Sequence, residues 1–311
     1  MLPDAIAREM FSLIKEVCRN PVFSSGKGEE RTLLNLALRS IHRSFQCDAS
    51  SMFLWKRSRS ILRKVCGNGD YCWDDETLVA FFHNTKPHLP DDIVMAPIRR
   101  GESVIGVLAL WRGDGFEKGV GKIATEFLRI FGCLLGSAFQ SRISNMCLRL
   151  NQALSSSVSP KDIIYRAMHD LRRLIDYDHG ATLLLRSGAN SGYVFARQVA
   201  WKKGKSNIVG KTIDIDWEAF ASRSVRLVRD DPIMVLLKDL GEDDAPARKS
   251  SIVAFIFDGC QPIGLFEIGS SRFDFFVDND LMIVERFFPI VDACAKSIKK
   301  DQGGINWRPQ H

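Results

Sequence analysis

The amino-acid sequence predicts an α+β protein of two similar domains, each a mostly antiparallel central sheet flanked by helices, joined by a long helix. Three observations predict this class. The 311 residues are enough for two cores, because single domains cluster at about 100–150 residues. One series of helix and strand patterns occurs twice in the same order. A proline-free stretch with apolar residues at helical spacing connects the two series.

Composition narrows the class of protein. The chain is 45% hydrophobic and 26% charged, which excludes disordered and fibrous proteins. The net charge of +6 is spread over short clusters, so we expect a solvated surface and no nucleic-acid partner. No uncharged run approaches the roughly 20 residues that cross a bilayer, and charges interrupt the N-terminal segment. We therefore expect a cytoplasmic protein with no membrane partner, whose scattered cysteines are free thiols.

The first repeated pattern is an amphipathic helix that leads into an apolar strand. Residues 33–48 precede a strand at 51–55, and residues 163–178 precede a strand at 181–185. In both helices the apolar residues recur every three or four positions, as one buried helix face requires. Each helical pattern ends at an aspartate a few residues before its strand.

The second repeated pattern is a β-hairpin followed by a phenylalanine and a closing helix. Residues 93–110 predict a hairpin that turns through Gly101, and residues 252–268 predict one that turns at Asp258-Gly259, a favoured hairpin dipeptide. In both copies an Ile-Gly pair opens the returning strand, at Ile105-Gly106 and Ile263-Gly264.

This order resembles that of GAF domains, in which an apolar strand, a glycine turn and a strand opening with Ile-Gly precede a closing helix. The resemblance covers residues 20–143 and 147–300, and it implies two GAF-like domains in tandem. Around them we expect an N-terminal helix at 1–19, a connecting helix at 122–158 and a polar tail at 301–311.

The two copies differ in the segment that caps the ligand cavity of GAF-like folds. In the first copy, 57 residues separate the pre-strand Asp48 from Ile105 of the Ile-Gly pair. In the second copy, 85 residues separate the equivalent Asp178 and Ile263, so the capping segment between them is longer. The longer cover makes the second domain the expected ligand domain, with aromatic walls and a few converging polar groups. The predicted ligand-binding residues are Trp201, Trp217, Arg229, Asp230, Asp231 and Arg272. In the alternative interpretation, Trp217 belongs to the core and the two aspartates form a turn.

The connecting helix is predicted to pair two subunits. A helix of some 30 residues extends about 45 Å, and one face could pack on its own domain while another contacts a second copy. The GAF resemblance supplies much of the expectation of a homodimer. The predicted interface residues are Ile123, Phe127, Ile130, Leu134, Ile143, Met146 and Leu150. In the alternative interpretation the helix packs only within the monomer.

The sequence contains no recognisable catalytic constellation. It lacks a phosphate-binding loop, a Gly-x-Ser-x-Gly elbow and a His-Glu-x-x-His pair. Cys72, His83 and His88 come nearest to a metal-ligand set, and we attribute their spacing to coincidence. We expect no catalytic residues, no metal site and no enzymatic activity. A lowered thiol pKa at Cys66 or Cys72 would be the first sign of an unrecognised enzyme.

The resemblance leaves the cofactor unknown, with a small organic ligand as the open class. Bilin-binding GAF domains use a cysteine commonly followed by histidine, and no cysteine here precedes one, which argues against a bilin. Some GAF sensors bind haem through histidine, but we interpret the candidates as surface residues, which argues against haem: His83, His88, His169 and His179. Phe276-x-x-x-Asp280 matches part of a cyclic-nucleotide motif, and a helix start with a capping aspartate explains it more simply.

Together these patterns predict a non-enzymatic, signal-sensing regulatory protein. A small ligand would bind in the second domain, and a helical dimer would transmit the signal to a downstream signalling protein. No output module follows residue 300, so we expect action through another polypeptide or a place within a longer chain. The alternative, from another class, is a structural protein–protein interaction or dimerisation module with no small ligand.

Overall fold

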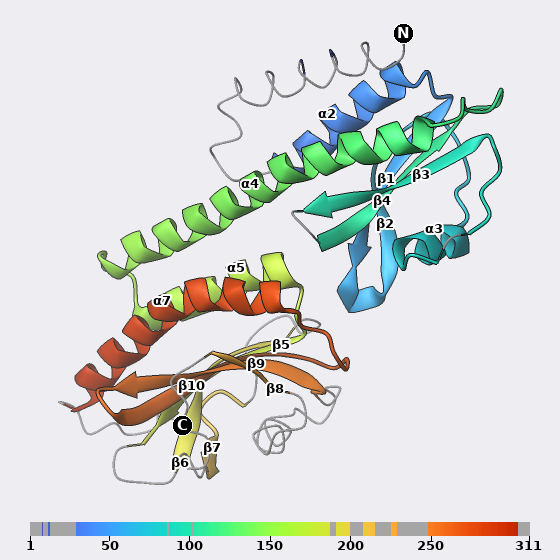
Figure 1. Cartoon of the computed structure of the whole chain (residues 1–311). Coiled ribbons are helices and arrows are strands. Elements are labelled where there is room, and N and C mark those ends of the chain that lie inside the picture. The colour runs from blue at the N-terminus through green and yellow to red at the C-terminus, as the bar shows by residue number, and fades with distance from the viewer. Residues whose placement is uncertain are drawn as a thin grey trace. The chain divides into compact units, whose positions relative to one another are not determined.

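The computed structural model describes residues 8, 12, 29–85, 87–100, 103–186, 191–199, 208–214, 225–228 and 248–303. The chain divides into two compact units, Met1–Asn145 and Met146–His311. Each unit contains one antiparallel sheet with helices against it (Figure 1).

The first unit is built on a four-stranded sheet with the strand order β2-β1-β4-β3 (Figure 1). Its strands are β1 (Ala49–Lys56), β2 (Ile61–Asn68), β3 (Ile93–Arg100) and β4 (Ser103–Trp111), with a 3-10 turn η2 (Arg57–Arg59) between β1 and β2. Its helices are α2 (Glu29–Ser44), α3 (Asp75–Phe82) and the first part of α4 (Val120–Leu154).

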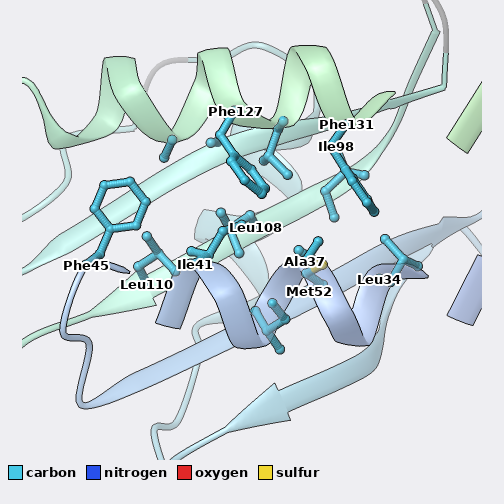
Figure 2. Close-up of a cluster of buried hydrophobic side chains, with 14 of the residues drawn as sticks. Leu34, Ala37, Ile41, Phe45, Met52, Ile98, Leu108, Leu110, Phe127 and Phe131 are labelled. Atoms are coloured by element: carbon cyan, nitrogen blue, oxygen red, sulfur yellow. The ribbon is translucent and has the colours of Figure 1, made fainter. Parts of the chain in front are cut away.

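Helices α2 and α4 cover one face of this sheet and bury a continuous apolar core (Figure 2). Apolar residues recur every three or four positions along α2, so Leu34, Leu38 and Ile41 all point into that core. Phe127 and Phe131 on α4 stack at 6.3 Å between ring centroids and close the core from the other helix. Helix α3 covers the opposite face of the sheet, where its Leu78 is fully buried.

The second unit is built on a six-stranded sheet with the order β7-β6-β5-β10-β9-β8. Its strands are β5 (His179–Leu185), β6 (Ser191–Val199), β7 (Thr212–Asp214), β8 (Arg226–Val228), β9 (Ser250–Asp258) and β10 (Gln261–Ser270). Helices α5 (Pro160–Ile175) and α7 (Asp278–Gly303) pack against each other and against the sheet (Figure 1).

The two sheets repeat one strand order. The arrangement β2-β1-β4-β3 recurs as β6-β5-β10-β9, and β7 and β8 extend the second sheet at its edges. The predicted α+β class, with two antiparallel sheets flanked by helices and a long helix between them, is confirmed. The predicted helix-to-strand and hairpin patterns also fall on observed elements, whereas β2, β6 and β7 were not anticipated because their strand patterns are weak.

The two pre-strand aspartates make equivalent contacts. Asp48 Oδ2 accepts a hydrogen bond from the Gly113 backbone N–H at 2.8 Å. Asp178 Oδ2 accepts one from the Ser271 backbone N–H at 3.0 Å. Each carboxylate therefore ties the start of a central strand to the chain that leaves the neighbouring strand, which explains why both copies carry an aspartate there.

The Ile-Gly pairs lie where the two central strands of each sheet leave no room for a side chain. A Cβ at Gly264 would lie 2.6 Å from the carbonyl oxygen of Leu183 on β5. A Cβ at Gly106 would lie even closer to the carbonyl oxygen of Phe53 on β1. Because no side chain fits between the strands, glycine is required at both positions.

Several expected segments fall outside the described residues. The N-terminal helix is described only at Arg8 and Ser12, both helical, and the tail only as far as residue 303. The segment expected to cover the second domain, residues 201–249, is described only at 208–214, 225–228 and 248–249. The strand predicted within it is β8. None of the helices in the described part of the chain has the length and apolar character that crossing a bilayer requires.

Gly106→Ala should destabilise the first unit by about 1–3 kcal/mol, because the new methyl group pushes β4 away from β1. Gly121→Ala is the matched control in the same unit, since its nearest neighbour outside the helix is the Val94 Cγ1 atom at 3.8 Å. Urea unfolding, with hydrogen exchange of the β1 and β4 amides as the local readout, measures both. Equal midpoints for the two variants would contradict the role given to glycine.

Candidate functional site

Charged and polar side chains gather inside the second unit on one face of its sheet. The Sδ atom of Met168 on α5 lies 3.2 Å from the position that a Cβ of residue 180 would take, so residue 180 faces the helices. The other even-numbered residues of β5 face the same way. Because side chains alternate along a strand, His179 and Ala181 point to the opposite face. Glu267 pairs with Ala181 across β5 and β10 and lies on that same face, as does Arg197 from β6. We name Arg197, Arg248, Glu267, His179 and Ser251 the arginine–glutamate cluster.

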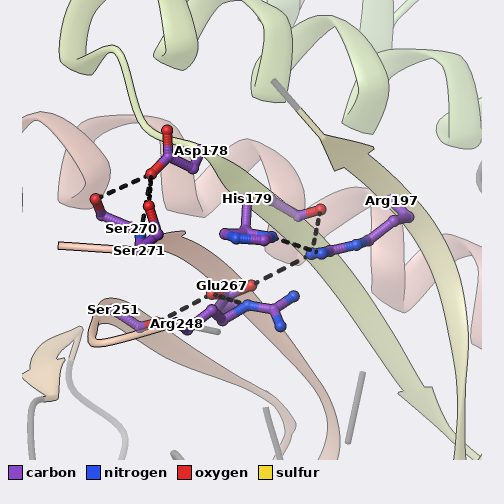
Figure 3. A network of polar contacts seen from close by, with 9 residues as sticks. Asp178, His179, Arg197, Arg248, Ser251, Glu267, Ser270 and Ser271 are labelled. Carbon is purple, nitrogen blue, oxygen red and sulfur yellow. Dashed lines mark hydrogen bonds and ion pairs between the residues drawn. The ribbon is translucent and has the colours of Figure 1, made fainter. Parts of the chain in front are cut away.

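Glu267 is the centre of the arginine–glutamate cluster (Figure 3). Its Oε1 accepts hydrogen bonds from Arg248 Nε at 3.1 Å and from Ser251 Oγ at 3.0 Å. Its Oε2 lies 4.0 Å from Arg197 Nη1, an ion pair longer than a hydrogen bond. The Glu267, Arg248 and Arg197 residues are only 0%, 2% and 3% exposed, so these charges interact away from bulk water.

His179 orients Arg197. The Arg197 Nη2 atom lies 2.8 Å from His179 Nδ1, and Arg197 Nη1 donates to the Gly180 carbonyl at 3.4 Å. A guanidinium can only donate, so Nδ1 accepts and the neutral imidazole carries its proton on Nε2. His179 is fully buried, which corrects our interpretation of it as a surface histidine: β5 is a central strand, covered on both faces. His83, His88 and His169 are exposed, as predicted.

The shape of the cluster depends on a glycine two residues beyond Glu267. A Cβ at Gly269 would overlap Glu267 Oε1 and would lie 2.9 Å from Ser251 Oγ. The missing side chain therefore gives the Glu267 carboxylate room to turn toward β9 and accept the Ser251 hydrogen bond.

The cluster places charged groups of both signs inside the unit. Its described members include two guanidinium groups, one carboxylate and a neutral imidazole. Taking each ion out of water costs several kcal/mol, and only well-placed opposite charge offsets that cost. Guanidinium groups remain protonated at any physiological pH and match the two oxygens of a carboxylate or phosphate. The cluster therefore holds charged hydrogen-bond donors and acceptors away from bulk water.

The first unit has an apolar face at the equivalent place. Ser51 on β1 pairs with Gly67 and Ala109, just as Ala181 on β5 pairs with Arg197 and Glu267. A small apolar cluster fills this face of the first sheet: Phe53, Leu78, Met95, Val107 and Ala109. Among the described residues, the repeated sheet thus carries buried charges on this face in the second unit only.

The residues predicted for the ligand site are mostly not described. Trp201, Trp217, Arg229, Asp230 and Asp231 lie outside the described residues. Arg272 is half-buried in the turn after β10, where its carbonyl accepts a hydrogen bond from Ser250 Oγ at 2.8 Å. The structure places it there rather than in the arginine–glutamate cluster.

Sequence reasoning missed every member of the cluster as a binding residue, His179 having been considered only as a haem ligand. The sequence did contain an indication of this site. A single charged residue inside an apolar strand is expected to be buried together with residues that compensate its charge. Glu267 stands between Phe266 and Ile268, and aligning the two hairpins on their Ile-Gly pairs places it opposite Ala109.

The predicted dimer residues on α4 differ in burial. Phe127 belongs to the core of the first unit, with Ile123 and Leu134 packed against it. Contacts within a single chain therefore explain why these three residues are apolar, without a second copy. The remaining members are half-buried or buried: Ile130, Ile143, Met146 and Leu150.

Local contacts of Asp280 and Cys66 bear on two interpretations of single residues. Asp280 Oδ2 accepts a hydrogen bond from the Val277 backbone N–H at 3.0 Å, which confirms its interpretation as a helix-start residue. Burial raises the pKa of Cys66 to about 11, despite a Met52 backbone hydrogen bond that lowers it. This shift is opposite to the one expected of a reactive thiolate.

Comparisons with known proteins found similarity to solved structures only; no family model and no curated protein matches the chain. The phycoerythrobilin-bound GAF domain of a cyanobacterial phytochrome is 17% identical, covers 51% of this chain and 97% of its own, and has a TM-score of 0.41. The GAF domain of a two-component sensor histidine kinase from Bacillus halodurans is 19% identical, with coverage of 45% and 95% and a TM-score of 0.34. A bacteriophytochrome from the photosynthetic bacterium R. palustris is 8% identical, with coverage of 94% and 75% and a TM-score of 0.44. These values are too low to establish a family or a ligand.

Glu267→Gln should destabilise the second unit by about 3–5 kcal/mol, because it removes the carboxylate that the two buried arginines share. Glu285→Gln, at an exposed position of α7 in the same unit, should stay within about 0.5 kcal/mol of the parent. Thermal unfolding with hydrogen exchange of β5 and β10 distinguishes them. A Glu267→Gln variant as stable as the parent would refute the ion-pair role.

Among the described residues, the buried and the exposed cysteines should react differently at pH 8. Burial raises the pKa of Cys47 and Cys294 to about 12 and that of Cys66 to about 11, so these thiols stay protonated and unreactive. Cys72, Cys133 and Cys260 are exposed and should react first with iodoacetamide. Peptide mapping after partial labelling measures this order, and early modification of Cys66 would contradict it.

Proposed function

We propose that this chain is a non-enzymatic, signal-sensing regulatory protein whose second unit binds a small ligand at the arginine–glutamate cluster. One observation carries the proposal. The same four-strand arrangement occurs twice, and the face that is apolar in the first unit holds buried charges in the second.

Stability alone does not explain these charges. Replacing buried ion pairs by apolar residues of similar volume is often neutral or stabilising, because desolvation offsets the attraction. The first unit forms the equivalent sheet with Gly67 and Ala109 at the matching positions. The fold therefore does not need the charges, which favours a role in binding.

The members of the cluster are suited to holding a ligand. Arg197 and Arg248 offer fixed, permanently charged donors, and His179 keeps Arg197 in place. The buried thiols of the described residues carry raised pKa values, which supports binding without covalent chemistry.

The packing of the second unit supports a route for the signal. Strands β9 and β10 carry Ser251 and Glu267 on one face, and α7 packs against both strands. Helix α7 in turn contacts the end of α4, where Cys147 Sγ lies 3.6 Å from the Arg286 carbonyl oxygen. A ligand that prefers one arrangement of these strands would bias α7 and, through it, α4.

The output in this proposal is a homodimer formed through α4 that acts on a downstream signalling protein. Ile130 is half-buried and Leu148 is 56% exposed, so α4 keeps apolar surface for a second copy. Solvent-exposed leucine on a long helix is typical of such contacts. The competing function is a structural interaction module that takes no small ligand.

Native mass spectrometry of the full chain tests both functions. The proposal predicts a dimer that carries a small molecule, released on denaturation, and bound ligand should slow hydrogen exchange in β5, β9 and β10. Strands β1 and β4 of the first unit serve as the internal control, because their faces lack the charged cluster. A ligand-free protein whose exchange no compound in a broad metabolite screen alters would favour the structural module.

A further inference from the structure

We infer that the outer edge of β2 in the first unit binds an extended acidic segment of a partner protein, which adds to the sheet as a further strand. The surface comprises the end of β1, the turn η2 and the first half of β2, residues 56–64, and we name it the basic hairpin. The inference goes beyond the proposed function, because it concerns the first unit and requires no small ligand.

The second unit carries a strand at the equivalent edge. Strand β6 occupies the place in its sheet that β2 occupies in the first, and β7 pairs antiparallel with the outer edge of β6. Both sheets shift register at the same place, just after Met52 on β1 and just after Thr182 on β5, so the strands align residue by residue. In this alignment β7 pairs with the residues that correspond to 61–63. The repeated fold therefore accommodates one more strand at this edge.

In the first unit no strand of the described residues occupies this edge. Strand β2 ends the four-stranded sheet on that side, and Ile61 at its start is 43% exposed. The edge of a sheet presents a row of backbone N–H and C=O groups, and extended peptides bind such edges as added strands. The opposite edge strand, β3, is a poorer acceptor because Pro97 within it has no N–H to donate.

The charge of the basic hairpin favours an acidic partner. Five basic residues lie within nine positions, and no acidic residue occurs from 49 to 69. The five are Lys56, Arg57, Arg59, Arg63 and Lys64, and the last three are exposed. The matching part of the second unit, residues 186–194, contains a single basic residue, Arg186. The basic hairpin is thus a feature of the first unit alone, and an anionic segment complements it.

The cations of β2 lie on both faces of the sheet edge. Arg63 pairs with Leu54, which packs against the core under α2 and α4, and Lys64 pairs with Phe53 in the cluster under α3. Neighbouring residues of a strand point to opposite faces, so two consecutive acids on an added strand would meet one cation on each face. A nucleic acid could use these charges but not the row of backbone groups, which favours a peptide.

The test measures binding of a labelled acidic peptide to the full chain by fluorescence anisotropy. The peptide has about eight residues, enough for one strand, with acidic pairs alternating with valine pairs. It should bind more weakly as salt is added, because the charges are exposed. Two counterparts should bind at least about ten-fold more weakly: a neutral one with glutamine pairs, and an acidic one whose N-methylated amides cannot pair with a strand. Equal binding by either counterpart, or tighter binding of a single-stranded oligothymidylate, would refute the inference.

Residue-resolved hydrogen exchange locates the bound peptide. Alternate amides of β2 face β1, and the others face outward. The acidic peptide should slow exchange of the outward amides of residues 61–64, with the amides of β3 as the internal control. Slow exchange of these amides without peptide would assign the edge to another occupant, a second copy if dilution abolishes the protection and a segment of the same chain if it does not. Either result would overturn the inference.

Arg63→Glu and Lys64→Glu should each weaken binding of the acidic peptide about 3- to 10-fold, because repulsion replaces an exposed ion pair. Lys122→Glu makes an equal change of charge at an exposed position of α4 in the same unit and should bind like the parent. All three positions are exposed, so the variants should fold like the parent. Parental binding by both hairpin variants, or an equal loss in Lys122→Glu, would contradict recognition by the basic hairpin.

Discussion

Each sheet depends on the close approach of its two central strands. At Gly106 and Gly264 the backbone of the returning strand comes so near a carbonyl oxygen of its neighbour that no side chain fits. Asp48 and Asp178 hold the same strand pair together at its other end. These contacts set the register that decides which residues face the helices and which face away, and every later feature follows from that division.

The two faces of each sheet are under different packing constraints. In both units one face of the sheet packs against the apolar side of an amphipathic helix. The residues on this face must therefore be apolar and of fitting size. The other face is free to differ, because the strands pair through their backbones whatever side chains point away from the helices. In the first unit this face is covered by α3 and is apolar. In the second it carries Glu267 and two arginines, and this difference makes one repeat a candidate binding domain.

The charged cluster also shows how small residues shape a site. Gly269 leaves the space that the Glu267 carboxylate occupies, and Ser251 supplies a hydroxyl at hydrogen-bond distance. His179 fixes Arg197 through an acceptor nitrogen, which requires the imidazole to be neutral. The cluster is thus a product of tertiary contacts. Its residues come from four strands and from Arg248, two residues before β9.

Local patterns in the sequence determined the fold class, the repeat, the long connecting helix and the helix start at Asp280, because periodicity, turn dipeptides and capping are properties of neighbouring residues. The prediction that the second unit binds the ligand, which came from the unequal length of the two copies, stays a prediction. Only the tertiary structure decided which side chains form the candidate site. Arg197, Arg248 and Glu267 come from separate segments, and pairing between strands is what brings their charges together. His179 was assigned to the surface because nothing within its own segment indicates that both faces of its strand are covered.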